Sequence, residues 1–132
     1  MPGPWDASLK QLCFADDQTL FTADTLTIGK EYDIIADVEI GASLNSFATV
    51  DRLVVTVTNL TTNQVVQTLT VPTALQPSAT VRREQRVIDF AALDATRVSD
   101  GDVLRATGSY RVTAGVNTDH DTSRSDTTIA VD

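Results

Sequence analysis

The chain has 132 residues, which is the usual size of one domain and enough to bury a core without covalent cross-links. Its single cysteine excludes an intrachain disulfide, and no apolar run approaches the roughly 18 residues that cross a membrane. The formal net charge of −8 disfavours nucleic acid as a partner, because an acidic surface repels phosphate groups. Aspartate supplies 15 of the 18 acidic residues and threonine is abundant, a composition typical of halophilic proteins and of GC-rich genomes alike.

Residues 1–17 differ from the rest of the chain and are predicted to form an N-terminal arm. Asp6 is a suitable cap for a short helical turn over residues 7–12, with Leu9 and Leu12 on one side of it. Four large apolar side chains crowd the arm, namely Trp5, Leu9, Leu12 and Phe14. Soluble monomers rarely leave such a patch in water, and aromatic anchors are typical of interfaces, so we expect these four to contact another protein chain. The alternative is that the arm folds back and caps one end of its own domain.

From residue 18 onward the hydrophobic pattern has a period of two, which indicates β-strands. The ranges predicted as strands are 19–28, 31–40, 52–60, 65–71, 79–90, 103–114 and 125–131. Residues 41–49 and 117–124 are predicted loops. Since no helix is long enough to connect parallel strands, residues 18–132 are expected to form an all-β, immunoglobulin-like antiparallel sandwich of about seven strands. The side chains expected between its sheets are Tyr32, Ile34, Ala36, Val38, Leu53, Val55, Val57, Leu104, Tyr110 and Val112.

The segment that opens the second of these strands carries a family resemblance. Leu26-Thr27-Ile28-Gly29-Lys30-Glu31-Tyr32 resembles the start of bacterial and archaeal immunoglobulin-like modules of the adhesion-related (CARDB-like) family. Residues 53–59, residues 100–114 and the closing Asp-Thr-Thr-Ile-Ala-Val follow in a similar order, so the resemblance covers residues 24–132. It implies the sandwich fold, and it implies modules that are usually parts of long secreted chains.

The polar side chains of residues 117–126 are the candidates for chemistry. The alternating oxygen ligands of a calcium loop are matched in part by Asn117, Asp119, Asp121 and Asp126. The glycine and the distal glutamate of the full loop are absent, so a solvated acidic loop is the competing interpretation. His120 is the only histidine and has no nucleophile motif near it, so we expect no catalytic residues.

Arg82, Arg83 and Arg86 form the only basic cluster in the sequence. Arg82 and Arg86 share a strand face with Glu84, whereas Arg83 points to the other side. One interpretation is cross-strand pairing with neighbouring carboxylates, worth about 0.2–1 kcal/mol for each pair. The other is a partner-binding patch for the acidic face of another protein, including a second copy of this chain.

These features predict a non-catalytic structural module that assembles onto a larger protein particle, such as the decoration, turret or tail of a virion. We expect protein subunits as partners, in a homo-oligomer or a larger assembly, without nucleic acid, membrane, or any cofactor except calcium. The chain does not open on a basic segment followed by an apolar stretch, so we expect synthesis in the cytoplasm without a secretion signal. The alternative function is a cell-surface or carbohydrate-binding module that calcium assists.

Overall fold

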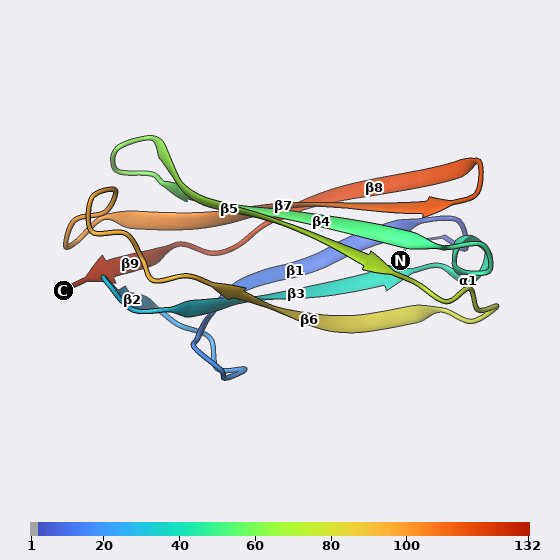
Figure 1. Ribbon diagram of the computed structural model, residues 1–132, viewed down its shortest axis with the longest axis horizontal. Coiled ribbons are helices and arrows are strands. Elements are labelled where there is room, and N and C mark those ends of the chain that lie inside the picture. Colours follow the sequence, from blue (N-terminus) through green and yellow to red (C-terminus); the bar gives the residue numbers. More distant parts are fainter. Residues whose placement is uncertain (1–2) are drawn as a thin grey trace.

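A computed structural model describes residues 3–132; Met1 and Pro2, the first two residues of the predicted arm, lie outside the described residues. Two β-sheets pack face to face. The smaller sheet has the order β1 (Ala7–Asp16), β3 (Tyr32–Ile40) and β6 (Arg82–Phe90). The larger sheet has the order β2 (Thr25–Thr27), β9 (Thr128–Val131), β7 (Val103–Ala114), β4 (Val50–Asn59) and β5 (Gln64–Ala74), and β8 (Asn117–Arg124) also pairs with β7. Figure 1 shows β1, β3 and β6 of the smaller sheet below β4, β5, β7 and β8 of the larger one.

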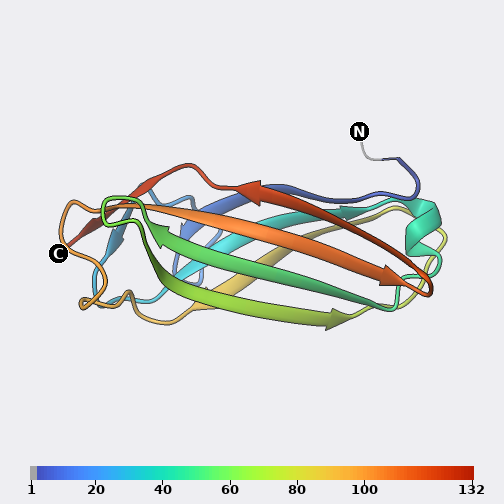
Figure 2. The ribbon, with the colours of Figure 1, turned by 90° about the horizontal axis from the view of Figure 1, so that it is seen from above.

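One end of the sandwich is closed by α1 (Ala42–Asn45), a single helical turn (Figure 2). Gly41 precedes it and leaves space for the N-terminal segment, because a Cβ at this position would lie 2.3 Å from the carbonyl oxygen of Gly3. Within residues 3–132, no helix is long and apolar enough to cross a membrane.

The core lies where the period-two pattern places it, between the two sheets. All ten predicted core side chains are at most 2% exposed. The register explains how they meet: Leu53 of β4 lies opposite Tyr110 of β7, and Ile34 of β3 lies opposite Ile88 of β6. The predicted all-β, immunoglobulin-like sandwich is therefore confirmed.

The strand count and pairing differ from the prediction in three places. The described residues form nine strands rather than about seven, because β1 and β8 occupy segments predicted as an arm and a loop. The range 19–28 contains only the three-residue strand β2. This short strand pairs with β9 in parallel, so the sandwich is antiparallel except at this edge.

β1 overturns the prediction of a separate arm with a short helix. Residues 7–16 form an edge strand of the smaller sheet, antiparallel to β3, and so belong to the sandwich itself. The register shifts at a β-bulge between Leu9 and Gln11. Because a bulge adds a residue, Leu9 and Leu12 face the same side of the strand although they are three positions apart, a spacing that also suits a helix. Gly108 makes room for both, since a Cβ there would lie 2.8 Å from a methyl carbon of each leucine.

Candidate functional site

Three of the four apolar residues predicted to contact a partner belong instead to the protein's own core. Leu9, Leu12 and Phe14 are each at most 3% exposed. They are buried because β1 turns them toward the space between the sheets, as an edge strand and not as the cap over one end that the alternative described. Trp5 differs, since it is 48% exposed and stacks on Phe47 with the ring centroids 6.2 Å apart. Trp5 therefore stays a predicted partner contact, and the other three do not.

Three of the four predicted calcium ligands lie on a strand, β8, and the fourth, Asp126, lies just beyond it; two of those on the strand already have partners. Asp119 accepts a hydrogen bond through Oδ2 from the backbone amide of Ala7 at 2.7 Å, and Asp121 accepts one from the amide of Leu9 at 2.9 Å. These carboxylates bridge the gap between β8 and β1, where the edge of β1 would otherwise leave buried amides unpaired. The other two predicted ligands, both exposed, are Asn117 and Asp126. The structure thus assigns Asp119 and Asp121 to closing the sandwich, and calcium binding there stays a prediction.

The predicted basic cluster on β6 forms ion pairs within the protein. Arg86 is mostly buried and donates to both carboxylate oxygens of Asp51, at 3.2 and 2.7 Å. The further pairs are Arg86 with Glu84, Arg82 with Glu84, and Arg83 with Glu39. These three arginines are therefore not a free docking patch, because cross-strand and intersheet carboxylates already bind their guanidinium groups.

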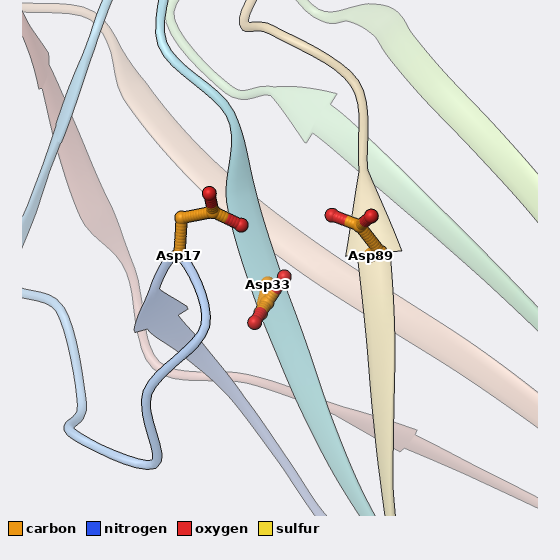
Figure 3. Close-up of side chains that lie close together, drawn as sticks. All are labelled: Asp17, Asp33 and Asp89. Carbon is orange, nitrogen blue, oxygen red and sulfur yellow. The ribbon is translucent and has the colours of Figure 1, made fainter.

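Three carboxylates from separate elements converge on the outer side of the smaller sheet: Asp17, Asp33 and Asp89 (Figure 3). One oxygen from each lies within 4.8 Å of the others. Asp33 is only 3% exposed, and its Oδ2 accepts a hydrogen bond from the backbone amide of Gln18 at 2.8 Å. Burial raises the pKa of Asp33, and the nearby Asp17 and Asp89 charges add to this, while the Gln18 amide partly offsets them.

The raised pKa of Asp33 predicts how stability depends on pH. The folded protein holds this proton more tightly than the unfolded chain does, so the contribution of Asp33 to stability is fully present below the ordinary aspartate pKa of about 3.9 and is lost as pH rises through the folded value. Asp33→Asn keeps an oxygen for the Gln18 amide and removes the charge. We expect it to raise the urea midpoint at neutral pH and to leave it unchanged in acid.

Asp37→Asn on the same face of β3 is the matched control and should change the midpoint much less. An Asp33→Asn variant that is less stable than the parent at neutral pH would contradict the prediction that the ionised Asp33 carboxylate destabilises the folded protein.

A basic surface covers the outer face of the larger sheet. The register of β4, β5, β7 and β8 brings together outward-pointing side chains that are mainly threonine and arginine. Its basic members are Arg52, Arg105, Arg111, Arg124 and His120. The acidic residues of the same strands, Asp51, Asp119 and Asp121, lie on the opposite, inner side. We call the outward-pointing side chains of these four strands the Arg/Thr face; it holds none of the 18 acidic residues.

The bases of the Arg/Thr face stand next to one another without counter-charges. Arg52 lies opposite Arg111, and Arg111 lies opposite His120, in one row across three strands. Across residues 3–132, every ion pair formed by an arginine or lysine involves a base outside this face. Like charges directly opposite each other destabilise a sheet, so the Arg52–Arg111 pair opposes folding until a negatively charged group neutralises it.

A shallow groove of about 480 Å³ lies in the Arg/Thr face. Its lining residues are Val54, Thr56, Thr107, Gly108, Ser109, Thr122, Ser123 and Arg124. Hydroxyl groups on three adjacent strands can donate and accept hydrogen bonds there, and the Arg124 guanidinium can bind a carboxylate with two parallel bonds. The groove therefore suits a ligand that is both hydroxylated and anionic.

Comparisons with known proteins bear on the fold. No protein-family model matches the chain, and no curated protein matches its sequence. Chains of solved structures do match, 11 in all. One is the crystal structure of the C-terminal domain of wzt, with a TM-score of 0.57 and 9% sequence identity, covering 98% of this chain and 74% of the other. At this identity the likeness concerns the sandwich alone, and the resemblance to the adhesion-related family stays a prediction.

Proposed function

We propose that the protein is a non-catalytic assembly module that docks through its Arg/Thr face onto an acidic surface of a larger protein particle. A virion is one such particle, with the module as a decoration, turret or tail component. The observation that carries the proposal is the unpaired row of Arg52, Arg111 and His120 on a protein whose net charge is −8.

Charge segregation supports a docking role for this face. Surface arginines in an acidic protein ordinarily gain from nearby carboxylates, as Arg83 and Arg97 do here. The arginines of the Arg/Thr face form no such ion pairs within residues 3–132, although 18 acidic residues are present in the chain. Complementary charge raises the rate of association and fixes the orientation of a partner, so such a face selects an anionic surface.

The groove favours a second candidate, an acidic polysaccharide. Hydroxyl groups from Thr56, Thr107, Ser109 and Thr122 line it beside Arg124, and these groups match sugar hydroxyls and a sugar carboxylate. No tryptophan or tyrosine lies on the Arg/Thr face to stack on a sugar ring, which makes this the weaker of the two candidates.

Three probes separate the candidates by calorimetry at low salt: poly-L-glutamate as an acidic polypeptide, alginate as an acidic polysaccharide, and dextran as a neutral one. We expect poly-L-glutamate to bind and salt to weaken the binding, because screening reduces contacts between exposed charges. The double variant Arg52→Ser, Arg111→Ser should weaken it by about tenfold or more, since both charges contact the same partner. Thermal unfolding should show that this variant is at least as stable as the parent.

The control is the double variant Arg83→Ser, Arg97→Ser, which removes the same charge away from the Arg/Thr face. It should leave the affinity close to that of the parent. Equal weakening by both double variants would mean that net charge alone governs binding. That result would contradict the proposal that the Arg/Thr face is the docking surface. Tighter binding of alginate than of poly-L-glutamate would favour the polysaccharide.

A further inference from the structure

β5 forms a free edge of the larger sheet. It pairs with β4 on one side and makes the lower margin of the sheet in Figure 2. The amide of Leu75, just beyond the strand, donates to the carbonyl oxygen of Thr49 at 2.9 Å and so points toward β4. Backbone direction alternates along a strand, so the N–H and C=O groups of Thr68 and Thr70 point away from β4, out of the sheet. These groups are available to another strand.

Around Thr68 and Thr70, this edge lacks the protection that natural sheets give to theirs. Charged side chains, short strands and prolines usually prevent edge strands from pairing with other molecules. β5 has 11 residues and carries no charge. The other edge strands are charged, as Lys10 shows for β1, Arg83 for β6 and Asp121 for β8, or very short, as β2 is with three residues. Pro72 lacks an N–H at one outward position, which leaves the stretch around Thr68 and Thr70 as the open part.

We propose that β5 pairs with β5 of a second copy, antiparallel about a two-fold axis, so that the two larger sheets become one. A second copy is the fitting occupant, because antiparallel pairing of an identical strand is self-complementary. The charge distribution agrees with this choice. Two chains of net charge −8 repel each other over most of their surfaces, and an uncharged edge is where they approach at least electrostatic cost.

The pairing has a structural consequence beyond the proposed docking role. The Thr68 side chain lies on the Arg/Thr face, with its hydroxyl 3.3 Å from that of Thr56. Joining two β5 edges therefore places two Arg/Thr faces side by side on one continuous sheet. A dimer built in this way would engage a repeating acidic surface at two points, which raises the apparent affinity without any new contact.

The test is the molar mass of the full chain by sedimentation equilibrium, from micromolar to sub-millimolar concentration at moderate salt. We expect a reversible monomer–dimer equilibrium. Thr70→Pro removes one outward N–H and leaves the hydrogen bonds to β4, as native Pro72 does, so it should weaken dimerisation about tenfold or more. Thr70→Ala keeps the N–H and is the matched control; it should dimerise like the parent.

Thr68→Lys with Thr70→Lys covers the case in which the proline variant does not fold. It places like charges against their copies across the two-fold axis and should abolish the dimer at low salt. A parent protein that stays monomeric throughout the range overturns the pairing, and so does a folded Thr70→Pro variant that dimerises normally. Neither result affects the docking proposal, because poly-L-glutamate binding is measured separately and a monomer can show it.

Discussion

Asp51→Ala should be one of the most damaging single substitutions in the protein, with an expected loss of about 3–5 kcal/mol in the free energy of unfolding. The Asp51 side chain is fully buried between the sheets and holds Arg86, which is only 16% exposed. The Tyr110 hydroxyl donates to the same carboxylate at 2.6 Å. Burial alone would lower the pKa of Arg86, but the Asp51 and Glu84 carboxylates raise it above its usual range. Because an arginine side chain is not deprotonated in proteins, Asp51→Ala leaves a mostly buried positive charge with Glu84 as its remaining partner. Urea denaturation at neutral pH measures the loss.

Two further variants isolate the cause. Replacing both partners, as Asp51→Leu with Arg86→Met, removes the uncompensated charge and should cost much less than the two single variants added together. Asp94→Ala breaks the exposed pair with Arg97 and should cost far less than Asp51→Ala, because solvent screens exposed ion pairs. A loss for Asp51→Ala as small as that for Asp94→Ala would show that the buried network does not stabilise the sandwich.

Leu12→Ala should lower the free energy of unfolding by about 2–5 kcal/mol, the range for a buried leucine that leaves a cavity. Leu12 is 3% exposed and faces Gly108 across the core. Leu20→Ala is the control from the same N-terminal region; Leu20 is 60% exposed, so its truncation should change stability by no more than about 0.5 kcal/mol.

Comparing Leu12→Ala with Leu20→Ala tests whether residues 7–16 form a core strand or a detachable arm. If Leu12→Ala melted as the parent does while association was lost, residues 7–16 would be a detachable arm after all. Thermal unfolding and sedimentation of the same samples give both answers.

The core could be predicted from the sequence because its side chains alternate with polar ones. β7 runs from Val103 to Ala114, the range predicted, since Leu104, Ala106, Tyr110 and Val112 keep a strict period of two. β3 and β4 agree within two residues at each end for the same reason. Where alternation is regular, the buried face of a strand follows from the sequence alone.

The two missed strands lack that regularity for different physical reasons. In β1 the bulge after Leu9 interrupts the alternation, and the remaining spacing suits a helix equally well. In β8 every side chain is polar, because Asp119 and Asp121 turn toward backbone amides of β1 instead of an apolar core. Hydrophobic periodicity does not detect a strand whose inner face is made of hydrogen-bond acceptors.

Only part of the Arg/Thr face could be predicted from the sequence. The alternation in β4 and β7 places Arg52, Arg105 and Arg111 on the outer side. That Arg52 and Arg111 lie opposite each other depends on the pairing of strands about 50 residues apart, which no local pattern reports. His120 and Arg124 join the face through β8, in a segment predicted as a loop.

The bridge between β1 and β8 bears on the order in which the molecule completes its fold. Asp119 and Asp121 bind amides that lie 112 residues earlier in the chain. During synthesis, β1 leaves the ribosome long before Gly108, Asp119 and Asp121 are added to the chain. Until then, the leucines of β1 are exposed to water or bound by a chaperone. Folds dominated by such distant pairings form slowly, in milliseconds to seconds for small β-proteins. A strand that is translated late in this sandwich thus secures β1, and a chain truncated before β8 would leave the apolar residues of β1 open to aggregation.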